Sequence, residues 1–372
     1  MKDAGIEIAV KKVKHDDKLA SFFDMETKNL ERVFGQHNSK HLIKPIAAYQ
    51  YYRDRCLVFP WAKGGNLLNY WERHDDQRSE PSKLKWLINE LEGICLAIEE
   101  LHEKDCTHGD LKPENILWFK ETDNAGHLQD NQCDQGRLQI VHMGLAKFYE
   151  EEASHTQLGQ GIGAATPSGT YRYELPEMDQ NRNINHPRSR ESDIWSMGYV
   201  LLETVIWIIY GFENVIAFQS QTRRFWSHDK NKKYSIDPYA HMCMEAIMTA
   251  LRDKFPGESV YKDLLLLVQK RLLVLVMPSH MGQRTQPVED IKKYRANAAD
   301  LHANLKDIFA KSESIKGYLT PVTDLKYPSN LSSHHLYTID ENAVQTQMDG
   351  PTNLKNEVSQ LIMKSKEVVS TD

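Results

Sequence analysis

Paired cysteines, an excess of positive charge and long apolar runs are the features that this sequence lacks. Its five cysteines are odd in number and none forms a C-x-x-C pair. This pattern argues against a disulfide framework and indicates reduced thiols in an intracellular protein, cytoplasmic or nuclear. The formal net charge is −6, with 46 basic and 52 acidic residues. Nucleic-acid-binding domains usually carry a basic surplus, so the composition predicts no nucleic-acid partner.

Signals for membrane insertion are also missing from the sequence. The first five residues, Met1–Gly5, contain no apolar signal core. The most apolar stretch, 264–277, is interrupted by Gln269, Lys270 and Arg271. It is too short and too charged to span a bilayer, so we expect a buried helix there and no membrane partner.

What is present is a chain of 372 residues, 40% apolar, which is long enough for two lobes with a core in each. Apolar periodicity predicts a strand over 5–13, an amphipathic helix over 17–35, and strands over 43–48 and 55–59. Proline and two glycines then end strand pairing, so the segment 60–65 is interpreted as a hinge.

Beyond this hinge the pattern becomes mainly helical. A long helix is predicted over 83–104, a short strand pair on either side of a polar insert at 120–136, and helices over most of 191–312. The final segment, 313–372, is polar and is expected to be largely irregular. No internal repeat is visible, so the chain is expected to form one unit of two lobes followed by a tail.

The segment His108–Asn115 carries the most specific chemistry. It places an acid, a base and an amide at fixed offsets before an apolar strand. Asp110 can accept a hydroxyl proton, Lys112 can neutralise phosphate charge, and the amide oxygen of Asn115 can bind a hard cation. Such a cluster alone can be a solvated loop. The full string in its helix–loop–strand context is instead typical of a phosphoryl-transfer loop.

From Gly5 to Ala310 the sequence resembles the eukaryotic protein kinase family, Ser/Thr type. Ile8–Lys11 is similar to the strand motif whose lysine holds the α- and β-phosphates of ATP. Glu26 resembles the helix glutamate that pairs with this lysine, with Glu31 as the alternative. The resemblance implies an α+β, bilobal fold. Because only Met1–Glu7 precede the lysine motif, we expect the small lobe to lack the first two strands of the family pattern.

This resemblance also implies domain boundaries. The kinase-like domain is expected over 1–312, with a small-lobe remnant at 1–59, the hinge at 60–65 and a large lobe at 66–312. The insert at 120–136 and the tail can serve as docking segments or be solvated loops.

Later motifs occur in the family's order. Gly169–Glu177 resembles the end of an activation segment, in which Thr170 would contact Asp110 and Lys112. The residues between Asp110 and Asn115 are similar to the Ser/Thr version of the loop. Together with the motifs around them, these matches make the resemblance specific.

Three further residues have structural roles by resemblance. Asp193 opens a helix and would cap the backbone of the catalytic loop. Glu177 and Arg295 are expected to form a structural ion pair rather than to take part in catalysis.

A nucleotide site follows from the same resemblance, with ATP as the cofactor. Ala9 and Leu117 would sandwich the adenine ring, and Phe59, Trp61 and Ala62 would line its edge. Ordinary core packing explains the same pattern, and both interpretations can hold together.

The sequence departs from the family at the metal-binding Asp-Phe-Gly motif, where it has His142–Gly144. Mg²⁺ prefers hard oxygen ligands, whereas imidazole suits Zn, Cu, Fe and Ni. Asn115 alone would hold Mg²⁺ poorly. A different metal bound by His142 and His108 is the alternative, but both histidines fit packing positions better.

Two other departures concern the phosphates and regulation. Only Met1–Glu7 precede the lysine strand, so we expect an open sheet edge and no glycine-rich lid. The glycines of 159–163 follow the catalytic loop and match a flexible loop, not that lid. Gly109 replaces the arginine that reads an activation-segment phosphate, so phosphorylation at Thr166 is not expected to control the protein.

The sequence therefore predicts a Ser/Thr protein kinase-like domain whose ATP-dependent phosphoryl transfer is weakened or lost. The alternative is a pseudokinase that acts as a binding or scaffold module. A protein substrate or partner protein is expected in either case.

Overall fold

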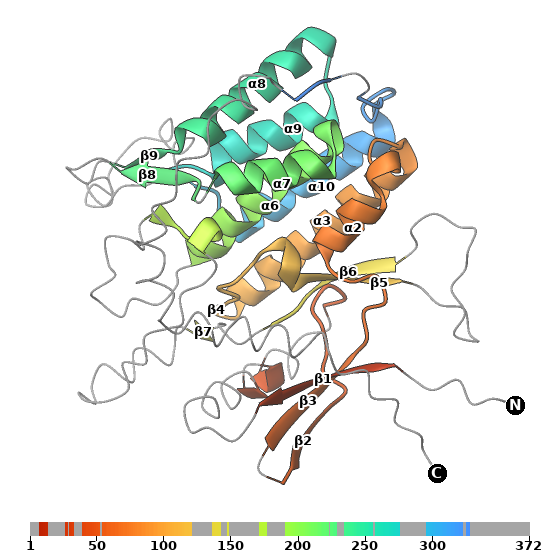
Figure 1. Cartoon of the computed structure of the whole chain (residues 1–372), viewed down its shortest axis with the longest axis vertical. Coiled ribbons are helices and arrows are strands. Elements are labelled where there is room, and N and C mark those ends of the chain that lie inside the picture. The colour runs from red at the N-terminus through yellow and green to blue at the C-terminus, as the bar shows by residue number, and fades with distance from the viewer. Residues whose placement is uncertain are drawn as a thin grey trace, which may run out of the picture.

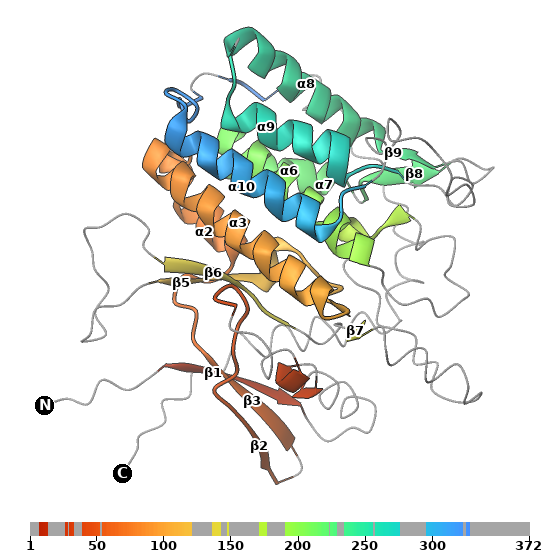
Figure 2. The same ribbon diagram turned by 180° about the vertical axis from the view of Figure 1, so that it is seen from behind.

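The architecture is known from a computed structural model, shown from two sides in Figures 1 and 2. A small sheet lies at one end and a larger group of helices at the other. The structure describes residues 7–13, 27–28, 30–32, 39–52, 54–120, 136–142, 147–148, 171–176, 190–222, 224–228, 234–255, 257–275, 295–322 and 325–327.

The small sheet has three antiparallel strands among the described residues, in the order β1-β3-β2. They are β1 (Ile8–Val13), β2 (Ala47–Tyr51) and β3 (Asp54–Pro60). The strand predicted over 43–48 is displaced, because β2 begins only after Pro45. Proline has no N–H to donate to a ladder, so regular pairing starts beyond it. Of the predicted helix over 17–35, residues 27–28 and 30–32 are described, and they are helical.

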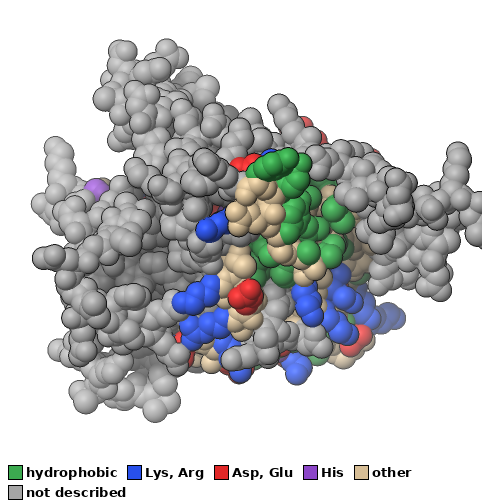
Figure 3. Space-filling model, turned by 90° about the horizontal axis from the view of Figure 1, so that it is seen from below, with side chains coloured by type: hydrophobic (Ala, Val, Ile, Leu, Met, Phe, Trp, Pro, Cys, Tyr) green, Lys and Arg blue, Asp and Glu red, His purple; other side chains and the backbone are tan. Residues whose placement is uncertain are grey.

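The far side of this sheet exposes apolar surface. All five residues of β2 are exposed, and the large exposed side chains Ile46, Tyr49, Tyr51 and Tyr52 belong to this strand and its ends. Viewed from the sheet end, the surface has an apolar patch bordered by lysine and arginine side chains (Figure 3).

The hinge connects the sheet to the large lobe through backbone hydrogen bonds. Gly64 N–H donates to Trp118 O at 3.1 Å, and Trp118 N–H donates to Gly65 O at 2.8 Å. A Cβ on Gly64 would lie 2.4 Å from the Trp118 carbonyl oxygen, so only glycine permits this approach. Helix α2 (Leu67–Arg73) follows at once, because Asn66 and Asn69 form a reciprocal capping box.

The large lobe is built around α3 (Pro81–Glu103) and α6 (Arg190–Tyr210). Among the described residues, α6 is the one helix long and apolar enough to cross a membrane, but its apolar window is wholly buried within the protein. Its apolar surface is therefore explained by the core, where Trp195, Tyr199 and Trp207 pack with at most 1% of each exposed. The predicted α+β class, with a small sheet lobe and a larger helical lobe, is confirmed.

Further elements of the large lobe are α7 (Phe212–Gln221), β8 (Trp226–His228), β9 (Tyr234–Ile236), α8 (Pro238–Lys254), α9 (Val260–Leu267) and α10 (Ala298–Ser314). Helices α7, α9 and α10 contact α6, α8 packs on α9, and α10 runs along α3 (Figure 2). The segment predicted as a buried helix over 264–277 is helical and mostly buried as far as Leu272, where α9 has continued into a π-helical turn, and residues 273–275 are not helical. In the described part of the helical region, β8 and β9 form a short hairpin.

The chain after α10 stays on the large lobe as far as it is described. Tyr318 is fully buried and its hydroxyl donates to Asp263 Oδ2 at 2.7 Å. The hydroxyls of Tyr327 and Tyr239 lie 2.9 Å apart. The packed part of the large lobe therefore extends past the predicted boundary at residue 312, while the rest of the predicted tail lies outside the described residues.

Candidate active site

The segment 108–115 lies between the two lobes, where several short elements meet. It follows α3 and β4 (Cys106–Thr107), which pairs with β7 (Lys147–Phe148). It ends in a 3₁₀ turn and runs into β5 (Ile116–Lys120), which pairs antiparallel with β6 (Gly136–Ile140). The loop therefore has regular structure on both sides, as a rigid site requires.

Asp193, at the start of α6, holds the loop backbone. Its two carboxylate oxygens accept hydrogen bonds from the N–H groups of His108 and Gly109, each at 2.8 Å. The His102 ring also bonds Asp193, at 2.9 Å. Burial alone would raise the pKa of Asp193, but the His102 bond and charge and the Gly109 N–H outweigh it and lower the pKa. The carboxylate is thus an ionised anchor beneath the loop.

Gly109 has a backbone conformation that suits glycine. Its φ is +78°, in the left-handed region where side chains with a Cβ are strained. The glycine that replaces the arginine of the family pattern therefore relieves strain at this turn.

Asp110, Lys112 and Asn115 come together as one cluster. Asp110 Oδ2 lies 3.3 Å from Lys112 Nζ, and the Asn115 amide nitrogen donates to Asp110 Oδ2 at 3.0 Å. The same nitrogen donates to the Asp110 carbonyl oxygen at 2.8 Å. Asp110 is 7% exposed. A carboxylate that is fixed by a cation and an amide can accept a proton from a hydroxyl presented to it.

Lys11 and His142 meet across the lobes, 131 residues apart in sequence. Lys11 Nζ, on β1, lies 3.4 Å from Nδ1 of His142, which follows β6. A lysine ammonium is only a donor, so we assign Nδ1 of His142 as the acceptor in this contact. His142 has a φ of +76°, which is strained for a residue with a Cβ and requires support from its surroundings.

These residues do not fit a magnesium ion. The Asp110 carboxylate is already engaged, and the described residues supply only the Asn115 amide oxygen and an imidazole at this point. Nowhere in the described part of the chain do three His, Cys, Asp or Glu side chains form a metal-binding group.

The alternative metal pair of His108 and His142 is wrong. His108 Nε2 donates to the Val141 carbonyl oxygen at 3.0 Å, and its Nδ1 accepts from the Asp110 N–H at 3.3 Å. Both ring nitrogens of His108 are thus used in holding the loop to the strand before His142.

The residues predicted to surround adenine lie on three elements that join at the hinge. Ala9 faces Phe59 across β1 and β3. Trp61 and Ala62 are half-buried in the hinge, and Leu117 bridges to Asn66. The structure thus brings these residues to the same junction, next to the Lys11–His142 contact.

Comparison with known proteins now decides the family. The sequence-family model described as the protein kinase domain matches residues 1–264 of this chain. The chain belongs to the protein kinase family. It is 30% identical over 186 residues to a probable myosin light chain kinase from Dictyostelium discoideum, covering 50% of this chain and 31% of that protein. With the serine/threonine-protein kinase nekl-2 of Caenorhabditis elegans it shares 25% identity over 294 residues, covering 74% and 71%.

The serine/threonine-protein kinase Doa of Drosophila melanogaster is 25% identical over 209 residues, covering 54% of this chain and 23% of Doa. The chain thus spans less than a third of the length of two of these relatives. The family and the Ser/Thr type of these relatives agree with the kinase-like function that the motifs predict.

Several predicted site residues lie outside the described part of this kinase domain: Glu26, Thr166, Thr170 and Glu177. Arg295 is described, and its guanidinium lies 5.0 Å from the ring centre of Trp195 on α6. It also donates to the Val274 carbonyl oxygen at 2.6 Å. Its pairing with Glu177 stays a prediction.

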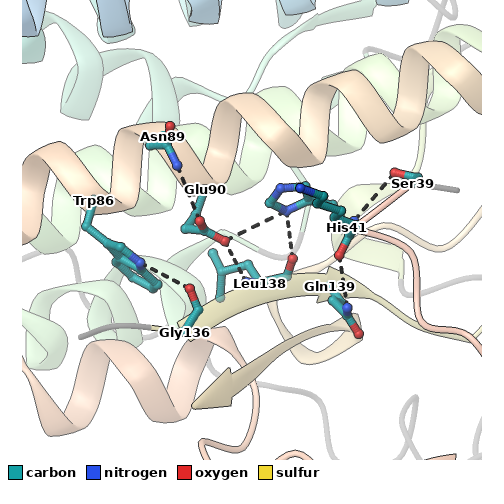
Figure 4. A network of polar contacts seen from close by, with 9 residues as sticks. Ser39, His41, Trp86, Asn89, Glu90, Gly136, Leu138 and Gln139 are labelled. Atoms are coloured by element: carbon teal, nitrogen blue, oxygen red, sulfur yellow. Dashed lines mark hydrogen bonds and ion pairs between the residues drawn. The ribbon is translucent and has the colours of Figure 1, made fainter. Parts of the chain in front are cut away.

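Sequence reasoning missed an anchor of the small lobe on α3 (Figure 4). His41 Nδ1 bonds the Leu138 carbonyl oxygen at 2.9 Å, while the Leu138 N–H donates to Glu90 at 2.8 Å. Ile140 N–H donates to the His41 carbonyl oxygen at 2.7 Å. Because β6 leads directly to His142, this network fixes the strand that carries the histidine. No pattern in the sequence signals it.

A second missed feature is Glu203 in the middle of α6. It is fully buried, 2.9 Å from the Tyr173 hydroxyl, and accepts from Gln219 Nε2 at 2.9 Å. A single acid within an otherwise apolar stretch is the signal that could have found it, because buried charges need partners.

Proposed function

We propose that this domain binds ATP at the junction of its lobes and transfers the γ-phosphoryl group to a serine or threonine hydroxyl of a protein, at a low rate. The observation that carries the proposal is the assembled cluster of Asp110, Lys112 and Asn115, held from below by Asp193. Asp110 accepts the hydroxyl proton, and Lys112 offsets charge on the transferred group.

The nucleotide is held by residues of both lobes in this proposal. Ala9 and Leu117 sandwich the adenine, whose edge meets Phe59, Trp61 and Ala62. Lys11 contacts the α- and β-phosphates, as its strand position supports. Glu26 orients Lys11, and Thr170 contacts the catalytic loop. The domain works inside the cell, on a protein substrate.

The low rate of phosphoryl transfer follows from the presence of a histidine at position 142. Protein kinases generally use ATP with Mg²⁺, and catalysis in the family is positioning plus electrostatic stabilisation. Here an imidazole bonded to Lys11 takes the place of the metal-binding carboxylate. The loss of one such ligand should lower the rate by several orders of magnitude.

A pseudokinase that binds nucleotide or a partner protein is the second candidate. The histidine at position 142 favours it, because an imidazole that contacts Lys11 stands where the family has a metal-binding carboxylate, while the cluster around Asp110 is kept. The two candidates differ in turnover, not in fold.

Phosphoryl transfer to a protein substrate separates these candidates. The full chain is compared with Asp110→Asn and with Asp76→Asn, an exposed acid of the large lobe that serves as the matched control. Transfer that is lost in Asp110→Asn and kept in Asp76→Asn supports the enzyme. Equal transfer in both variants overturns the role of Asp110, and no transfer by a folded protein favours the pseudokinase.

A further inference from the structure

The short segment 171–176 lies close to the catalytic loop. Burial raises the pKa of Tyr173, and the charges of Glu203 and of Glu114 raise it further. Glu114 belongs to the loop 108–115, one residue before its end. Its charge acts on Tyr173 because the two segments are neighbours in the fold.

Two hydrogen bonds to the backbone hold the later part of this segment. The carbonyl oxygen of Tyr173 accepts from the Ser196 hydroxyl on α6 at 3.1 Å. The carbonyl oxygen of Glu174 accepts from the indole N–H of Trp226 on β8 at 2.8 Å. Residues 173 and 174 are thus attached to α6 and to the hairpin by contacts that do not involve the residue before them.

Arg172 holds the earlier part of the segment, two positions after Thr170, and does so through α7. Its Nε donates to the Thr222 carbonyl oxygen at 3.2 Å, and its Nη2 donates to the Gln219 carbonyl oxygen at 2.6 Å. Both acceptors belong to the C-terminal end of α7, where helix carbonyl groups lack partners within the helix and a cation is favoured. The planar guanidinium supplies two donors in a fixed geometry, which suits this pair of carbonyl groups.

The other end of α7 is held by a side chain of opposite charge. Asp75, between α2 and α3, accepts through Oδ1 from the Phe212 N–H at 2.8 Å. An acid at the N-terminus and a base at the C-terminus of a helix both match its dipole. Loss of either anchor should therefore weaken α7, but only loss of Arg172 also releases the segment beside the catalytic loop.

We propose that Arg172 is a positioning residue for the protein substrate. By fixing the start of the segment 171–176 to α7, it keeps in place the surface on which a protein is held while its hydroxyl reaches Asp110. The inference rests on the proposed function, which brings that hydroxyl to Asp110. Both hydrogen bonds of Arg172 go to α7, whereas Lys11 lies on the small sheet, so Arg172 acts on the protein substrate and not on ATP.

Steady-state phosphoryl transfer to dephosphorylated casein, with ATP and casein varied in turn, tests the proposal on the full chain. In Arg172→Met the KM for casein should rise about tenfold, as expected for the loss of hydrogen bonds from a charged group, and the KM for ATP should not change. Arg172→Lys keeps a cation that can bond one carbonyl group, so it should raise the KM for casein by a smaller factor. Asp75→Ala removes the other anchor of α7 and is the matched control. It should lower the melting temperature and leave both KM values unchanged.

The outcomes separate this inference from the proposed function. Transfer with the same KM for casein in Arg172→Met and in the unaltered chain overturns the inference and leaves the proposed function standing. Equal increases of that KM in Arg172→Met and Asp75→Ala also overturn it, because the cause would then be a weakened α7. Absence of transfer by the folded, unaltered chain overturns the proposed function and this inference with it. If Arg172→Met does not fold, Arg172→Lys decides, and an unchanged KM for casein in that variant refutes the positioning role.

Discussion

The hydroxyl of Tyr173 lies 2.9 Å from Glu203 Oε2, which links the described segment 171–176 to the centre of α6. Both side chains are buried. Burial raises the pKa of Glu203 to about 8, and burial together with the nearby Glu203 raises the pKa of Tyr173 well above its ordinary value. The residues after Thr170 are therefore attached to the core by a buried hydrogen bond between these two side chains.

The first prediction concerns the pH dependence of stability. Because the folded pKa of Glu203, about 8, exceeds its ordinary value of 4.5, the folded protein retains a proton that the unfolded chain releases. The contribution of Glu203 to the free energy of unfolding is fully present below pH 4.5 and falls as pH rises towards 8. Glu203→Gln should remove this slope in urea unfolding at pH 5 and pH 8. The exposed Glu213→Gln should retain it, and an equal slope in all three proteins would refute the assignment.

The second prediction concerns the anchor beneath the catalytic loop. Asp193→Ala leaves the N–H groups of His108 and Gly109 without their acceptor and should lower the free energy of unfolding by about 3 kcal/mol. The pKa of Asp193 is lowered in the folded protein, so its contribution is present above the ordinary carboxyl pKa and is lost as pH falls through the folded value. Urea unfolding at pH 7 and pH 3 measures both effects. A variant as stable as the parent at pH 7 would contradict the anchoring role.

The third prediction concerns Lys112. Its removal in Lys112→Met leaves the Asp110 carboxylate, 7% exposed, without the cation at 3.3 Å. Any phosphoryl transfer should fall about a hundredfold, because a charge that stabilises the transition state is lost. Lys306→Met, at an exposed position of α10, is the control and should leave the rate unchanged. Equal rates for the two variants would show that Lys112 acts only as a surface charge.

The sequence predicted the elements whose signals are local. The long helix α3, the hinge and the pairing of β5 with β6 follow from periodicity and from proline and glycine. The strand predicted over 43–48 begins only at Ala47 in the structure. The apolar pattern does not reveal that Pro45 lacks the N–H that strand pairing needs. The contact between Lys11 and His142 could not be predicted, since the two residues lie 131 positions apart in the sequence. Contacts between residues that are distant in the sequence, rather than local conformational preferences, determine such side-chain arrangements.

The fourth prediction tests the anchor between His41 and α3. Gly93 faces His41, and a Cβ on Gly93 would lie 2.1 Å from His41 Nε2. In an exposed helix, Gly→Ala would stabilise by up to about 1 kcal/mol. Gly93→Ala should instead lower the free energy of unfolding by about 2 kcal/mol, because His41 must leave its bond to Leu138.

Gly257→Ala is the matched control, because a Cβ there meets nothing within 4 Å. Since His41 also holds Ile140, and His142 follows two residues later, Gly93→Ala should weaken nucleotide binding as well as stability. Urea unfolding and ATP titration of both variants measure the two effects. If Gly93→Ala lowers stability but leaves ATP affinity unchanged, the network supports the fold alone and does not position His142.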